Sequence, residues 1–168
     1  MNRPRLAQLE EAAHLIDLYC RGLKAVGLDK GRCEEDNRAK FLVWLEQRIK
    51  KDEFWVIDDG GAPASLMHLL PAENEIISVV TRDGKEGKGF AEALIRSAQE
   101  RSNYLTAIPV THGGRGLFDK CGFALCPEHE PNWCWRRNAV CEEHRRSSRG
   151  FAYGRPGALA DRWHYEAT

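Results

Sequence analysis

Residues 79–91 read Val-Val-Thr-Arg-Asp-Gly-Lys-Glu-Gly-Lys-Gly-Phe-Ala. The β-branched run that leads into them, Glu75 to Val80, is typical of a strand. After the glycines, apolar residues at steps of three and four predict a helix from Phe90 to about Ser102. Glycines let the main chain approach a ligand closely, and the first N–H groups of a helix are free to bind an anion. The stretch predicts a strand–turn–helix junction suited to phosphate groups, although a plain tight turn has the same composition.

Two common phosphate-binding motifs fit this stretch less well. A Walker turn ends in Gly-Lys followed by Ser or Thr, whereas Lys88 is followed by Gly89. A dinucleotide-binding turn has the spacing Gly-x-Gly-x-x-Gly and opens an N-terminal βαβ unit. Here the glycines lie in the middle of the chain, so neither motif accounts for the junction.

The rest of the chain reads as a mixed α/β domain built around this junction. Apolar residues at helical or alternating spacing, together with turn signals such as Asp-Asp-Gly-Gly at 58–61, set the elements. We expect, in chain order, a short edge strand over 3–7, helices over 7–24 and 34–50, three strands over 54–57, 64–70 and 75–80, the helix that begins at Phe90, a strand over 104–110, a short helix over 116–121, and strands over 123–126 and 133–136. The three consecutive strands predict an antiparallel meander, and the junction is expected in the middle of the sheet.

Two motifs of this chain resemble those of the GNAT superfamily of N-acetyltransferases. The segment 86–91, Glu-Gly-Lys-Gly-Phe-Ala, is similar to the family's acetyl-CoA motif: Gln or Arg, two residues, Gly, one residue, then Gly or Ala. The segment 116–123, Gly-Leu-Phe-Asp-Lys-Cys-Gly-Phe, resembles the family's closing signature, commonly Leu-Tyr-Glu-Lys-x-Gly-Phe. The resemblance covers about residues 54–137 and implies a mixed, mostly antiparallel central sheet flanked by helices. It also implies an acyl-CoA-dependent N-acyltransferase with acetyl-CoA as co-substrate and no metal.

The resemblance places the cofactor on a strand end, the glycine-rich turn and one aromatic position. Main-chain N–H groups near Val79 and Val80 would polarise the thioester carbonyl, and the turn would bind the pyrophosphate. The residues so implied are Val79, Val80, Thr81, Glu86, Gly87, Lys88, Gly89, Phe90, Ala91 and Phe118.

Two of these positions depart from the family pattern. Glu86 stands where Gln or Arg is usual, with Lys85 and Lys88 beside it to offset its charge. Phe118 stands where many members carry a Tyr that protonates the leaving thiolate, and a phenyl ring has no proton to give. The departures raise a second reading, a GNAT-fold binding or regulatory module without catalysis.

In the family an amine attacks the thioester directly, so a base must take its proton. Glu75 is the predicted base, because it begins the strand that leads into the turn, as in the histone acetyltransferase branch. The alternative for Glu75 is a solvated carboxylate at a strand start. His112, just after the next predicted strand, is the other candidate base, against the alternative of a surface loop histidine.

The six cysteines allow more than one interpretation. The chain has no apolar run long enough to span a bilayer and no signal-peptide core, so we expect a cytoplasmic protein whose six cysteines are thiols. A zinc site is the weaker alternative, because the spacings are irregular and contain no Cys-x-x-Cys pair. Its ligands would come from Cys126, His129, Cys134, Cys141 and His144. Cys121 as an acyl-carrying nucleophile has no evident partner base.

The overall charge limits the class of partner. The 25 basic and 25 acidic residues cancel, which disfavours broad binding to nucleic acid. Trp133 and Trp135, with arginines at 136, 137, 145, 146 and 149, are the one feature that favours it, through an aminoacyl-tRNA or nucleic-acid acceptor. We therefore expect an acetyltransferase domain over 1–141, an Arg- and aromatic-rich tail over 142–168, and a small-molecule, peptide or protein amine as acceptor. No membrane partner is expected, and a homodimer is compatible with the family.

Overall fold

The computed structural model describes residues 3–125 and 133–136 of the 168-residue chain. Its elements follow the predicted order. They are β1 (Arg5–Leu6), the 3-10 turn η1 (Leu9–Glu11), α1 (Ala12–Ala25), α2 (Glu35–Ile49), β2 (Phe54–Asp58), β3 (Pro63–Leu70), β4 (Glu75–Thr81), α3 (Phe90–Arg101), β5 (Tyr104–Ala107), α4 (His112–Lys120), β6 (Ala124–Leu125) and β7 (Trp133–Arg136).

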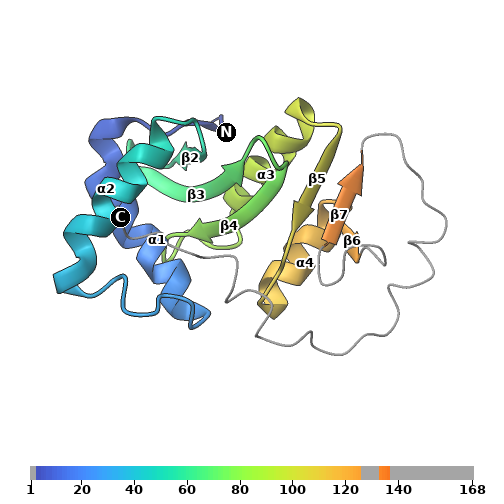
Figure 1. Cartoon of the computed structure of the whole chain (residues 1–168). Helices are drawn as coiled ribbons and strands as arrows, with labels where there is room; N and C mark the ends of the chain where they lie inside the picture. Colours follow the sequence, from blue (N-terminus) through green and yellow to red (C-terminus); the bar gives the residue numbers. More distant parts are fainter. Residues whose placement is uncertain (1–2, 126–132, 137–168) are drawn as a thin grey trace.

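The described strands form one seven-stranded sheet in the order β1-β2-β3-β4-β5-β7-β6 (Figure 1). Strands β2, β3 and β4 are the predicted antiparallel meander. Only β4 and β5 pair in parallel, as expected for two strands joined by a helical crossover. The junction after β4 lies in the middle of the sheet, as predicted.

Helices cover both faces of this sheet. The apolar faces of α1 and α2 pack against β2 and β3 in one core, which includes Leu15, Leu45 and Phe54. Helices α3 and α4 pack on the other face in a second core, with Leu94, Ile95 and Phe118 at its centre. The mixed, mostly antiparallel sheet flanked by helices is thus confirmed.

One glycine sets how closely α1 approaches the sheet. Gly22 lies over β4, and a Cβ at this position would collide with the side chain of Val80. A glycine inside a helix costs about 1 kcal/mol relative to alanine, so this one has to be explained by packing. Here the absence of a side chain lets α1 lie directly on the strand that carries the junction.

Helix α1 begins at Ala12 rather than at residue 7, and two later boundaries also differ from the sequence prediction. Strand β5 ends at Ala107 rather than Val110, and α4 begins at His112 rather than Gly116. Glycines at 113, 114 and 116 make the start of α4 look like a loop, because glycine disfavours helix. Thr111 overcomes this by capping the helix, since its Oγ1 accepts a hydrogen bond from Gly114 N–H at 2.9 Å.

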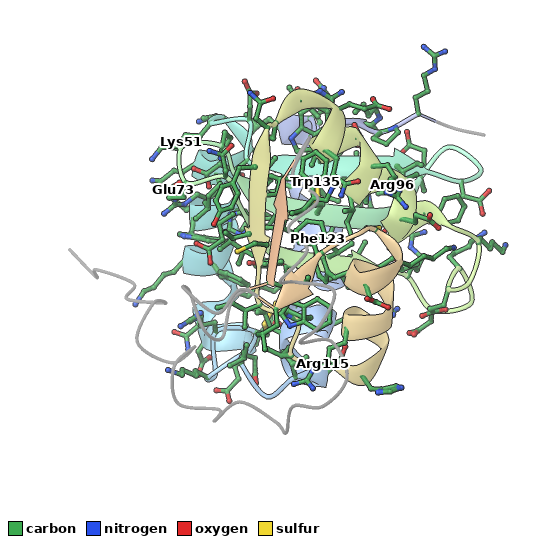
Figure 2. The ribbon with its side chains drawn as sticks, turned by 90° about the vertical axis from the view of Figure 1, so that its right-hand side faces the viewer. Lys51, Glu73, Arg96, Arg115, Phe123 and Trp135 are labelled. Carbon is green, nitrogen blue, oxygen red and sulfur yellow. A yellow bond between two sulfur atoms is a disulfide. The ribbon has the colours of Figure 1, made fainter. Side chains whose placement is uncertain are left out.

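The segment with the two tryptophans lies inside the sheet of described strands and not at its edge. Strand β7 lies between β5 and β6, and Trp133 and Trp135 pack against the α3–α4 core. Figure 2 looks onto this end of the sheet, with Trp135 and Phe123 labelled. Two rings packed in this way are poorly placed to stack on bases. The arginines at 137, 145, 146 and 149 and the whole tail over 142–168 lie outside the described residues.

The expectation that all six cysteines are thiols is wrong for two of them. Cys20 in α1 and Cys33 in the loop before α2 form a disulfide across Cα atoms 5.5 Å apart. That expectation rests on a cytoplasmic location alone, and the location of a protein does not show which of its cysteines the fold brings together. The bond ties the end of α1 to the loop that leads into α2.

Candidate functional site

The sheet opens between β4 and β5. These strands pair only through Glu75 with Thr106 and Ile76 with Ala107; β4 then continues to Thr81 while β5 has ended. A cavity of about 320 Å³ lies in this gap. Its walls come from α1, from β4 after residue 75, from residues 108–111 and from α4.

A β-bulge shapes the β4 wall of this cavity. His68 pairs with Ser78 and Leu69 with Ile76, so Ile77 is an extra residue in β4. Beyond the bulge, Val80 accepts a hydrogen bond from Ser65 on β3, and Arg82 N–H donates to Ala64 C=O.

The main chain of β4 therefore alternates between two neighbours. Since Val80 and Arg82 face β3, the main-chain groups of Val79 and Thr81 face the open gap. The N–H of Val79 is thus available to a group bound in the cavity. Val80 contributes its side chain to the cavity wall, while its carbonyl is turned toward β3.

The glycine-rich turn closes one end of the gap. Gly84, Gly87 and Gly89 have φ values of 70°, 73° and 83°, a region that side chains other than glycine rarely adopt. Helix α3 begins at Phe90 with Gly89 as its N-cap, and no side chain caps it. Its first N–H groups are therefore free for an anion, and the helix dipole favours negative charge there.

Arg21 of α1 holds this turn against the cavity. Its guanidinium donates to the C=O of Thr81 and pairs with Asp83 at 2.9 Å and with Glu86 at 3.1 Å. A hydrogen bond from its own backbone N–H, together with Arg21, lowers the pKa of Glu86, so this carboxylate is ionised at neutral pH. Glu86 lines the cavity.

The charge of Glu86 is therefore balanced by a residue distant in the sequence, and not by its neighbours Lys85 and Lys88. Lys85, expected to offset it, pairs with Asp59 of the β2–β3 hairpin at 2.7 Å, and Lys88 lies 3.9 Å from the same carboxylate. Arg21 takes their place.

Replacing Arg21 with Gln should weaken CoA binding about tenfold, because the carboxylate of Glu86 would then face the phosphates uncompensated. Solvent screens part of this repulsion at so exposed a carboxylate, which is why the expected loss is no larger. The double variant Arg21→Gln/Glu86→Gln should recover most of the affinity in calorimetric titration. An equal loss in the single and double variants would contradict this account and assign Arg21 a direct contact with the cofactor.

Phe118 lies in the cavity wall. Its ring is 6% exposed and contacts Phe123 edge-on, with centroids 5.0 Å apart. Thr81 and Glu86 also line the cavity; Gly87, Lys88 and Gly89 form the turn, and Phe90 and Ala91 begin α3.

The two candidate bases lie at the margins of the cavity. Glu75 begins β4 at the end away from the turn, and the cavity wall starts one residue later, at Ile76. His112 is exposed in the first turn of α4, between Thr111 and Gly114, which do line the cavity. Neither side chain is part of the wall.

Three polar residues of the site were missed by sequence reasoning: Tyr19, Arg21 and Ser78. Tyr19 and Ser78 line the cavity, and Ser78 lies earlier on β4 than the turn that carries Glu86. Tyr19 reads as an apolar face residue of a helix, and Ser78 as an ordinary strand residue. Only the packing of α1 on β4 reveals their role in the wall.

The alternative sites gain no support within the described residues. No group of three metal-ligating side chains occurs in 3–125 and 133–136. Cys134 is buried there, and Cys126, His129, Cys141 and His144 lie outside these ranges. Cys121 is fully buried, and burial raises the pKa of its thiol, which disfavours the reactive thiolate. No helix in the described part of the chain is long and apolar enough to cross a membrane.

Comparison with known proteins gives structural neighbours only. No protein-family model matches the sequence. No curated protein matches it either. PaiA N-acetyltransferase from Thermoplasma acidophilum, solved in complex with coenzyme A, is 12% identical, with a TM-score of 0.60 over 80% of this chain and 96% of that one.

Two bacterial structures have a similar fold. Apo YjaB from Escherichia coli is 17% identical, with a TM-score of 0.54 over 80% of this chain and 94% of that one. An N-acetyltransferase from Staphylococcus aureus Mu50 is 18% identical, with a TM-score of 0.55 over 75% and 85%. Together with the split between β4 and β5, these neighbours identify the architecture: the chain has the fold of the GNAT N-acetyltransferases.

Proposed function

We propose that this protein is an N-acyltransferase that moves an acetyl group from acetyl-CoA to a primary amine. The observation that carries the proposal is the cavity between β4 and β5, which reaches Glu86 in the turn that precedes the uncapped N-terminus of α3. That pairing offers a narrow channel for a thioester arm and main-chain N–H groups for a pyrophosphate. The named acetyltransferases among the structural neighbours, one of them bound to coenzyme A, support it.

In this proposal the residues of the site have separate roles in binding the cofactor and in stabilising the reaction. The turn over 84–89 and the first N–H groups of α3 would bind the pyrophosphate of acetyl-CoA. The N–H of Val79, which faces the gap, would donate to the thioester oxygen and stabilise the negative charge that develops during attack. Phe118 would pack against the cofactor without donating a proton, so the leaving thiolate would be protonated by water.

The acceptor is a small-molecule, peptide or protein amine that reaches the cavity end near Tyr19 and Ser78. Glu75 and His112 stay predictions for the base. The competing function is a GNAT-fold module that binds CoA without catalysis, which Phe118 favours. The neutral charge of the chain and the packed rings of Trp133 and Trp135 leave nucleic-acid and aminoacyl-tRNA acceptors with less support. Cytoplasmic location and a homodimer remain expectations.

Calorimetric titration of the purified chain with acetyl-CoA and with CoA tests the proposal. We expect a single site of micromolar affinity for both, followed by release of free thiol when a panel of primary amines is added. Binding without thiol release on any amine would favour the non-catalytic module. A folded protein that binds neither ligand would refute the proposal.

A further inference from the structure

A buried chain of hydrogen bonds runs from the cavity into the α1–α2 core. Tyr19 Oη lies 3.0 Å from Nδ1 of His68 on β3, and Nε2 of the same ring lies 3.3 Å from Oε2 of Glu53. Arg48 donates to both oxygens of Glu53 at 3.2 Å. Tyr19, His68 and Glu53 are 1%, 3% and 6% exposed, respectively.

The chemistry of these groups fixes the direction of the bonds. Burial raises the pKa of Glu53, but the hydrogen bond from His68 and the charge and hydrogen bonds of Arg48 outweigh it, so the net effect lowers that pKa. An ionised carboxylate only accepts hydrogen bonds, so Nε2 of His68 carries the proton. Nδ1 is then the acceptor, and Tyr19 donates its hydroxyl proton to it.

The ring of His68 is held in this orientation by aromatic neighbours. Phe54 stacks on it, with centroids 4.5 Å apart and planes 9° apart, while Tyr19 and Trp44 meet it edge-on. Burial lowers the pKa of His68 despite the opposing effect of Glu53, so the imidazole is neutral at pH 7. A neutral, oriented imidazole beside a carboxylate is the arrangement of a general base.

Tyr19, at one end of this chain, lines the cavity together with Ser78. Ser78 Oγ is buried and lies close enough to the phenol to act on it as a hydrogen-bonding neighbour. Because Tyr19 donates its proton to His68, its oxygen acts as an acceptor, and a lone pair beyond the one that faces Ser78 can accept a proton from a bound group. Burial raises the pKa of the phenol well above its ordinary value, although Ser78, Arg32 and Arg48 oppose the shift, so Tyr19 keeps its proton at rest.

The position along β4 places this phenol at the reacting end. Ser78 lies three residues before Thr81, which is about 10 Å along a strand from the turn that would bind the pyrophosphate. Ser78 is also the residue next to Val79, whose N–H faces the gap. A thioester carbonyl on Val79 would therefore lie beside Tyr19.

We propose that Tyr19 and His68 form a proton relay that deprotonates the acceptor amine, a step that rests on the proposed acetyl transfer. As the C–N bond forms and the C–S bond breaks, the amine proton passes to Tyr19 Oη while the hydroxyl proton of Tyr19 passes to His68 Nδ1. Glu53 stabilises the resulting imidazolium. CoA leaves as a thiolate and is protonated by water, and His68 returns its proton through Tyr19 to water after the products leave.

The relay and Glu75 are competing acceptors for the same proton, and variants separate them. Tyr19→Phe keeps the ring and removes the hydroxyl, so kcat should fall about 100-fold or more while the Kd for acetyl-CoA stays within twofold. His68→Gln should cause a similar fall, and the double variant should be no slower than the singles. Tyr104→Phe is the matched control, since its hydroxyl contacts Cys134 Sγ outside the cavity and its loss should leave kcat unchanged.

The pH profile distinguishes a relay from a structural role. His68 accepts a proton only when neutral, so wild-type kcat should fall as the pH drops through the pKa of His68, which burial holds below about 6.5. Tyr19→Phe should lose this acidic limb. The ratio of the two profiles cancels the ionisation of the amine itself, because that amine is common to both.

Two results would overturn the relay while leaving acetyl transfer in place. One is a Tyr19→Phe kcat within twofold of wild type alongside a tenfold or larger loss in Glu75→Gln, which would assign the base to Glu75. The other is a ¹⁵N NMR spectrum of histidine-labelled protein, assigned with His68→Gln, that shows the proton on Nδ1 of His68. Failure of the proposed function is recognised separately, by wild-type protein that does not bind acetyl-CoA, and the relay would fall with it.

Discussion

Replacing Gly89 with valine should weaken CoA binding at least about 100-fold, equivalent to about 2.7 kcal/mol. Gly89 has a φ of 83° and is the N-cap of α3, directly before the free N–H groups that we assign to the pyrophosphate. A branched side chain disfavours this φ and stands where the phosphate must approach the main chain. The measurement is calorimetric titration with CoA, on protein shown to be folded by circular dichroism.

A second glycine provides the matched control. Gly61, between β2 and β3, has a φ of 85°, and a Cβ there would have no heavy atom within 4 Å. Gly61→Val therefore introduces the same backbone strain without a ligand nearby. We expect both variants to lose similar thermal stability and only Gly89→Val to lose CoA. Similar Kd values for CoA in the two variants would contradict the assignment of the pyrophosphate site to the turn at Gly89.

The part of the fold that could be predicted from sequence is the part with local signals. Residues close together in the sequence indicate the three strands before the turn, the helix after it and the second motif near Phe118. The order of these elements restricts the topology, because a strand–helix–strand unit must cross over to a parallel neighbour. The sheet order, and the place of the junction within it, follow from that restriction.

The walls of the cavity could not be predicted in this way. Tyr19 and His68 are separated by 49 residues and meet only because α1 lies on β4 and β3. Arg21 reaches Glu86 across 65 residues, and no spacing rule connects a helix residue to a distant turn. The early end of β5 depends on Thr111 capping a glycine-rich helix, which local propensity opposes.

Long-range contacts of this kind change how the two departures from the family motif, Glu86 and Phe118, are interpreted. Read alone, Glu86 places a carboxylate beside a phosphate site, which points to a binding or regulatory module that has lost catalysis. With Arg21 on α1 the same carboxylate becomes half of an ion pair that fastens the turn to the helix. Phe118 is not compensated in this way, so in the function we propose the thiolate takes its proton from water.

Breaking the disulfide between Cys20 and Cys33 should lower the stability of the domain by about 3 kcal/mol. The sequence separation is 13 residues, and closing a loop of that size restricts the unfolded chain by about this amount. For a domain of this length, the melting temperature should fall by about 6–12 °C in Cys33→Ser. The measurement is thermal unfolding with and without reductant.

The reductant is also the internal control, because it should lower the melting temperature of wild-type protein and leave Cys33→Ser unchanged. Peptide mapping after alkylation without reductant should find Cys20 and Cys33 unmodified; a labelled pair would contradict the bond. The loop so closed includes Leu23, Val26 and Leu28, which line the cavity. Reduction of the disulfide should raise the KM for the amine more than the Kd for acetyl-CoA, because this wall lies on the α1 side, where the acceptor is expected, and not on the turn.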